Sequence, residues 1–135
     1  MATASDFAAW AVPDLVIPLG ERTYTVRPPS VDDSRKLLAC AVRGEVGLGI
    51  AKGPVPDEVQ EVLDTIGPDE HPALGATYQQ MVDAGEHPET IDRMAYYAIF
   101  YWTRGKEYAD TLATVLWSPR DLTAESAGEA APKGS

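Results

Sequence analysis

The sequence predicts a mainly α-helical domain that begins with a β-hairpin. The chain has 135 residues, of which 44 % are hydrophobic, so it is long and apolar enough for one core. Apolar residues repeat at helical spacing in its second half, and an alternating pattern typical of strands occurs only near its start. We therefore expect an arm over residues 1–13, one globular domain over residues 14–118 and a disordered tail over residues 119–135.

The hairpin is expected over residues 14–27. Two runs rich in β-branched and aromatic residues, Leu15–Leu19 and Thr23–Val26, flank a short link that contains Gly20. Pro18 lacks the amide hydrogen that a sheet ladder uses, so its strand should lie at an edge. Because an isolated hairpin is only marginally stable in water, its apolar face should pack on the helices.

Two helices are expected in the first half of the chain, over about residues 31–43 and 56–65. Ser30 lies three residues ahead of an aspartate, which is typical of a helix N-cap, and Gly44 is a natural helix terminator. The segment over residues 45–55 is rich in glycine and valine and has no clear period. It is predicted to be a mobile loop.

Three more helices are expected over about residues 72–84, 88–104 and 106–117, which completes a bundle of four to five short helices. The helix over 88–104 has the strongest periodic signal. Its apolar residues on one face are Ile91, Met94, Ala95, Ala98, Ile99 and Trp102. Further aromatic residues widen this face, which indicates a central helix that is contacted on several sides.

The charge balance and the cysteine content exclude several classes of protein. Twenty-one acidic against eleven basic residues give a formal net charge of −10, which repels phosphate backbones and anionic lipids. We therefore expect neither nucleic acid nor a membrane as a partner. The longest apolar stretch, Met94–Trp102, is about half a membrane span. No secretory signal is recognisable, and the single cysteine, Cys40, cannot form an intrachain disulfide.

No pattern of side chains indicates an enzyme, a cofactor or a metal ion. The histidines, His71 and His87, lie at opposite ends of a predicted helix about 18 Å long, so they cannot share one ion. Cys40 lies beside an apolar helix face and is expected to be buried and inert. The glycine-rich segment over residues 44–53 lacks both the preceding strand and the Gly-Lys-Ser/Thr ending of a phosphate-binding loop. We therefore predict a non-catalytic protein that works by binding another protein.

Three residues are the candidates for partner binding. Most aromatic residues of the helix over 88–104 are expected in the core, because they occur at helical spacing. Tyr97 and Tyr101 point away from the predicted inner face and are therefore expected to be exposed anchors. Met81 is the third candidate, since flexible methionine side chains suit a surface that binds an apolar client.

Several motifs follow one another in an order that resembles a known family. A Pro-Pro-Ser sequence follows the apolar hairpin at Leu15–Val26. A second motif begins at Leu74 and reads Leu-Gly-x-x-Tyr-x-x-Met-Val-x-x-Gly. A third begins at Phe100 and reads Phe-Tyr-Trp-Thr-x-Gly-x-Glu-x-Ala. Together they resemble the tail assembly chaperones of long-tailed, siphovirus-type phages and prophages of actinobacteria. The resemblance covers about residues 14–117, and its motifs are structural rather than catalytic.

The resemblance implies a non-enzymatic function in viral tail assembly. Chaperones of this family bind the long, aggregation-prone tape measure protein and assist assembly of the tail tube, whose subunits are a further expected partner. Such a protein acts in the cytoplasm of the infected or lysogenic host and is not expected in the mature virion. Self-association of the chain remains open.

Two other interpretations remain open on the sequence alone. One is a structural head–tail connector, which would be found in purified virus particles. The other is an acidic inhibitor that mimics DNA, a class that usually presents carboxylates in regular rows. One short row is present, formed by Asp57, Glu58, Glu61 and Asp64, and the other acidic residues are spread along the chain.

Overall fold

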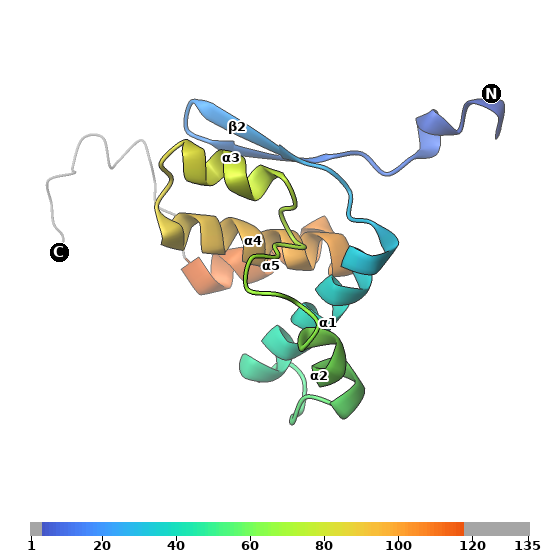
Figure 1. Ribbon diagram of the computed structural model, residues 1–135, viewed down its shortest axis with the longest axis vertical. Coiled ribbons are helices and arrows are strands. Elements are labelled where there is room, and N and C mark those ends of the chain that lie inside the picture. The colour runs from blue at the N-terminus through green and yellow to red at the C-terminus, as the bar shows by residue number, and fades with distance from the viewer. Residues whose placement is uncertain (1–3, 118–135) are drawn as a thin grey trace, which may run out of the picture.

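The computed structural model describes residues 4–117 and has a two-stranded antiparallel sheet and five α-helices within that range (Figure 1). The elements in chain order are a 3-10 helix η1 (Ala4–Trp10), strands β1 (Leu15–Leu19) and β2 (Arg22–Val26), and helices α1 (Val31–Gly47), α2 (Asp57–Leu63), α3 (Thr77–Asp83), α4 (Pro88–Arg104) and α5 (Lys106–Trp117). The predicted mainly α-helical class with an N-terminal hairpin is confirmed. The disordered tail predicted over residues 119–135 lies outside the described residues.

The hairpin forms where the alternating pattern predicts it. Leu19 pairs with Arg22 next to a two-residue turn, and Gly20 in that turn has a φ of 64°, a value that favours glycine. β2 packs against α3, where the Thr77 hydroxyl donates a hydrogen bond of 2.7 Å to the backbone carbonyl of Thr25. The hairpin therefore rests on the helices, as expected for so small a sheet.

One main core joins the hairpin to α1, α3 and α4. Its buried apolar residues are Leu15, Tyr24, Val26, Leu37, Ala73, Leu74, Met81, Ile91, Met94 and Ala98. A second, smaller cluster joins α1 to α2, and a third surrounds Phe100 between α1, α4 and α5. Since α4 contributes to the main and the third cluster and contacts α1, α3 and α5, it is the central helix that its periodicity predicts.

The end of α1 differs from the prediction. The helix extends to Gly47 rather than to residue 43, so the loop predicted over residues 45–55 is wrong in its first part. The buried carboxylate of Glu45 accepts hydrogen bonds from Arg104 of α4 and from a tyrosine hydroxyl of α5. These tertiary contacts hold the last turn in a helical conformation despite its glycines.

Gly44 lies inside α1 instead of ending it. A Cβ atom at this position would lie 2.9 Å from the Tyr96 hydroxyl oxygen and 3.2 Å from Cζ of Phe100, both on α4. The missing side chain therefore allows α1 and α4 to approach each other closely.

We expect Gly44→Ala to lower the free energy of unfolding by about 1–2 kcal/mol, because the enclosed Phe100 ring cannot move aside without disturbing the core. Gly47→Ala in the same helix is the matched control. A Cβ at Gly47 meets open space, so alanine should stabilise the helix by up to about 1 kcal/mol. Urea unfolding of both variants measures the difference. If both substitutions stabilised the protein equally, Gly44 would have no role in helix packing.

The other helix ends show smaller differences. α2 is shorter than the predicted range of residues 56–65, and α3 is much shorter than the range of 72–84. Gly75 has a φ of 56°, which interrupts the helical conformation, and residues 72–76 form turns ahead of α3. The ends of α4 and α5 agree with the prediction. None of the helices between residues 4 and 117 has both the length and the apolarity that crossing a membrane requires.

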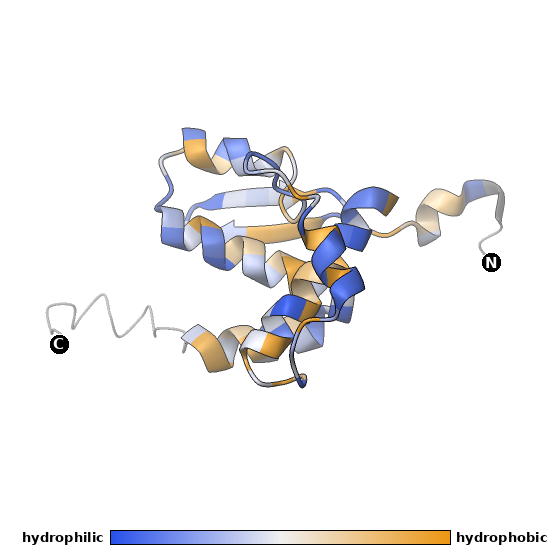
Figure 2. Cartoon of the chain, turned by 60° about the horizontal axis from the view of Figure 1, so that its bottom comes forward, coloured by the Kyte–Doolittle hydropathy of each residue, from blue (hydrophilic) through white to orange (hydrophobic). Residues whose placement is uncertain are grey.

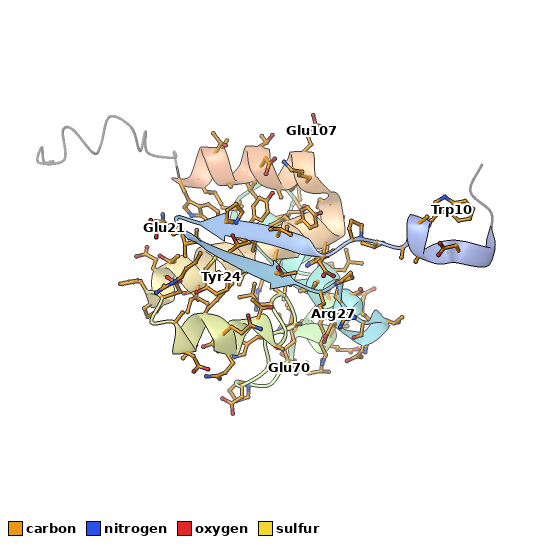
Figure 3. All side chains as sticks on the ribbon, turned by 90° about the horizontal axis from the view of Figure 1, so that it is seen from above. Trp10, Glu21, Tyr24, Arg27, Glu70 and Glu107 are labelled. Carbon is orange, nitrogen blue, oxygen red and sulfur yellow. The ribbon has the colours of Figure 1, made fainter. Side chains whose placement is uncertain are left out.

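Residues 4–13 form an arm ahead of the hairpin. The arm extends away from the helices (Figure 1), and Trp10 lies on η1, well apart from the sheet (Figure 3). The rings of Phe7 and Trp10 contact each other edge to face, with their centroids 5.5 Å apart. Both side chains are exposed.

Candidate partner-binding groove

The three predicted partner-binding residues have different environments. Met81 is fully buried in the main core, so its prediction as a surface anchor is wrong. Its side chain lies on the face of α3 that packs inward, where it fills space among the residues of the hairpin and α4. Tyr97 and Tyr101 are half-buried and lie four residues apart on α4, which places them on one side of that helix.

Tyr97 and Tyr101 line a groove of about 510 Å³, which we call the tyrosine groove. One wall is β1 with the residue before it, over residues 14–18, and α5 lies on the other side. Figure 3 shows β1 running beside α5 with side chains between them. The residues that line the groove are Asp14, Leu15, Val16, Ile17, Pro18, Thr90, Arg93, Met94, Tyr97, Tyr101, Lys106 and Trp117.

The floor of the tyrosine groove is one face of α4. Thr90, Met94, Tyr97 and Tyr101 follow one another at spacings of three or four residues, which aligns their side chains along the helix. Met94 and Tyr97 also pack in the main core, so the floor is continuous with the interior of the domain. The groove therefore offers a row of large side chains on a rigid element.

Contacts with α5 hold Tyr97 in place. Its hydroxyl donates a hydrogen bond of 2.5 Å to Oδ1 of Asp110, and Asp110 also forms an ion pair of 2.6 Å with Lys106. The rings of Tyr97 and Tyr101 are stacked with their centroids 6.2 Å apart. Burial and the hydrogen bond to the Asp110 carboxylate raise the pKa of Tyr97. The phenol therefore stays a neutral hydrogen-bond donor at physiological pH.

The outer edge of β1 is open towards the tyrosine groove. β1 pairs only with β2 among the described residues, so its other edge has no strand partner. Residues of an antiparallel strand point their backbone groups alternately to either side. Since the pair Leu19–Arg22 closes a two-residue turn, the backbone groups of Pro18 and Val16 point away from β2. Val16 thus offers a free N–H and C=O to an extended segment.

Two cationic side chains stand at the tyrosine groove of this acidic protein. Lys106 forms an ion pair with Asp110. Arg93 forms an ion pair of 3.5 Å with Glu89, and the Arg93 guanidinium lies 5.7 Å from the ring centre of Trp117. Both cations are exposed enough to contact a partner. An apolar floor flanked by cations fits a partner segment that combines apolar with acidic side chains.

A second cavity of about 360 Å³ lies between α1, α4 and the turns before α3. It is lined in part by Cys40 and His71, which could suggest a nucleophile and a base. Burial raises the pKa of the Cys40 thiol against the opposing effect of Arg43, so this thiol stays protonated and unreactive. His71 is stacked on Tyr78 with the ring centres 3.4 Å apart. The cavity therefore carries no activated nucleophile.

Metal ligands do not gather in the described part of the fold. Over residues 4–117 there is no group of three or more His, Cys, Asp or Glu side chains placed to hold a metal ion. The four acidic residues that form the short row predicted on the sequence, at positions 57, 58, 61 and 64, are all exposed on or beside α2.

The sequence reasoning missed the walls of the tyrosine groove. The candidate residues did not include Arg93, Lys106 or Trp117, and the open edge of β1 was not considered as a binding surface. The helical spacing from Thr90 to Tyr101 would have indicated the floor, and Pro18 already indicated an edge strand. The position of α5 is a tertiary feature that periodicity does not provide.

Comparison with known proteins identifies one family. A family described as a domain of unknown function (DUF7426) matches residues 5–135, which is nearly the whole chain. No curated protein and no solved structure matches the chain. Because the description of the family gives no activity, a function has to be argued from the tyrosine groove.

Proposed function

We propose a non-catalytic binding function for this chain, which belongs to the family described as a domain of unknown function (DUF7426). The protein is a tail assembly chaperone that binds the tape measure protein of a phage or prophage and assists assembly of the tail tube. It acts in the cytoplasm of the bacterial host and leaves the tail before the virion matures. The tape measure protein is its main partner, and the tail tube protein is a second one.

The tyrosine groove is the observation that supports this proposal most strongly. A tape measure protein is long and helical, with stripes of apolar side chains. Such a stripe fits a floor on which Met94, Tyr97 and Tyr101 present a matching row of large side chains. Tyrosine suits this role, because its ring supplies contact area while its hydroxyl can still bind polar groups.

The charge of the protein supports the same function. A chaperone has to keep an apolar client dispersed, and the formal net charge of −10 on each bound copy makes coated clients repel one another. Arg93 and Lys106 line the tyrosine groove, so positive charges that can attract acidic side chains of a client lie where the client would bind. The rest of the acidic surface then faces water.

Co-expression with the tape measure protein of the same phage or prophage tests the proposal. We expect the tape measure protein to be insoluble alone, and to become soluble and copurify when this chain is present. Purified virus particles should lack the chain. A tape measure protein that remains insoluble and unbound would contradict the proposal. Detection of the chain in purified particles would instead favour the structural connector.

A pair of tyrosine variants tests whether the client binds in the tyrosine groove. Tyr101→Ala should weaken binding of the tape measure protein about tenfold or more, as is usual for an aromatic anchor in a groove. Tyr78→Ala is the matched control, because Tyr78 is also half-buried but lies on α3, outside the groove. Pull-down at several client concentrations, together with thermal melts of both variants, measures the effect. Equal losses in the two variants would show that the client binds elsewhere.

A further inference from the structure

The arm is an apolar feature of the described chain that has no packing partner. Phe7, Trp10 and Val12 are 63 %, 50 % and 65 % exposed. No strand or helix within residues 15–117 packs extensively on η1, and the arm stands apart from the domain with apolar residues along it (Figure 2). Three large apolar side chains on one short segment are typical of a surface that binds another protein.

The tyrosine groove has the features that such an arm requires. Its floor presents aromatic rings at Tyr97 and Tyr101, and aromatic side chains such as Phe7 and Trp10 pack favourably against rings of this kind. Asp6 gives the arm a negative charge beside Phe7, and the cations Arg93 and Lys106 stand at the groove. The groove and the arm are therefore complementary in apolar surface, and Asp6 can contact a cation at the groove.

The direction of the arm makes a second copy its natural binding partner. Residues 11–14 lead from η1 to β1, and η1 lies beyond the end of the sheet, away from the helices of its own domain (Figure 3). The open edge of β1, which includes Val16, can also pair with the extended backbone of an incoming arm.

We propose that the arm of one copy binds in the tyrosine groove of a second copy. Each copy then donates one arm and accepts another, so the contact joins different surfaces of the two copies. Reciprocal exchange between two copies gives a closed pair, and exchange along a series of copies gives rings or open filaments. Because one groove cannot hold an arm and a client together, the arm also competes with any client that binds there.

Sedimentation velocity of the full chain over a wide range of concentrations tests the proposal. We expect the wild-type protein to form larger species as its concentration rises. The double variant Phe7→Ser/Trp10→Ser disables the arm, and Tyr101→Glu disables the groove by placing a charge among the large side chains of its floor. Each variant alone should associate at least tenfold more weakly than the wild type. Val16→Glu, on the exposed edge of the groove, serves as a second groove variant in case Tyr101→Glu impairs folding.

Mixing the two classes of variant gives the sharpest result. An equimolar mixture of an arm variant and a groove variant contains one intact arm and one intact groove for each pair of molecules. We therefore expect the mixture to form dimers and nothing larger, although neither variant associates alone. No client is present, so the outcome is independent of the proposed binding of the tape measure protein.

Three outcomes would overturn this proposal. The wild-type protein could remain monomeric at every concentration while limited proteolysis shows its arm protected, which would place the arm on its own domain. The arm variant could associate as strongly as the wild type, which would place the contact elsewhere. Finally, the mixture could remain monomeric, which would exclude a contact between arm and groove.

Discussion

Phe100→Ala should lower the free energy of unfolding by about 4 kcal/mol, in the range usual for removal of a large buried aromatic side chain. Phe100 is 1 % exposed. Its ring packs edge to face on Tyr96, with centroids 5.1 Å apart, and stacks on Tyr108 at 5.7 Å. Because these neighbours come from α4 and α5 and the cluster also includes Ala41 of α1, the cavity would loosen three helices at once.

Urea unfolding followed by circular dichroism measures this effect, and Phe7→Ala is its control. Phe7 is the other phenylalanine of the chain and is exposed on the arm, so its removal should change the stability by no more than about 0.5 kcal/mol. Similar losses in the two variants would contradict the assignment of Phe100 to the core.

Glu45→Gln should lower the free energy of unfolding by about 2–3 kcal/mol at neutral pH. The Glu45 carboxylate accepts two hydrogen bonds from Arg104, of 3.0 and 2.8 Å, and a third of 2.7 Å from the Tyr108 hydroxyl. An amide has one oxygen and no charge, so it leaves the guanidinium partly unpaired in a largely buried site. Chemical unfolding at pH 7 measures the loss. Glu107→Gln is the control, since Glu107 is exposed at the start of α5 and should change the stability little.

The same variant should alter the pH dependence of stability. Burial alone would raise the pKa of Glu45, but the hydrogen bonds from Arg104 and Tyr108 outweigh it and lower the pKa below its usual 4.5. A carboxylate whose pKa is lower in the folded state than in the unfolded state stabilises the folded protein at every pH above its unfolded-state pKa. This contribution is lost as the pH falls through the folded-state pKa. The wild-type protein should therefore lose its advantage over Glu45→Gln below about pH 4.5. A constant difference between pH 7 and pH 3 would contradict this account.

Local patterns predicted the hairpin and the central helix correctly. Alternating residues with Pro18 indicated an edge strand, and the apolar period of residues 88–104 indicated a helix contacted on several sides. The same kind of period shows why Met81 was a poor choice as a surface anchor. Met81 lies four residues after Thr77 on the same face of α3, and both are buried. The helical spacing of apolar residues therefore favoured a buried position for Met81.

Long-range contacts account for what the sequence could not provide. The last turn of α1 depends on the pairing of Glu45 with Arg104, which lies 59 residues further along the chain. Gly44 was interpreted as a helix end because its close approach to Phe100 is visible only in the folded structure. In the same way Tyr97 and Tyr101 were found from their spacing, while the walls of their groove depend on where β1 and α5 pack.

Site-specific photo-crosslinking during tail assembly tests most directly whether the tyrosine groove binds the tape measure protein. A crosslinking amino acid is placed at Val16, which is exposed on the wall of the groove, and in a separate variant at Val31, which is more exposed but lies outside it. We expect position 16 to crosslink to the tape measure protein and position 31 not to do so. Two results would contradict the account, provided that the complex with the tape measure protein forms. One is a crosslink from position 31, and the other is the absence of a crosslink from position 16.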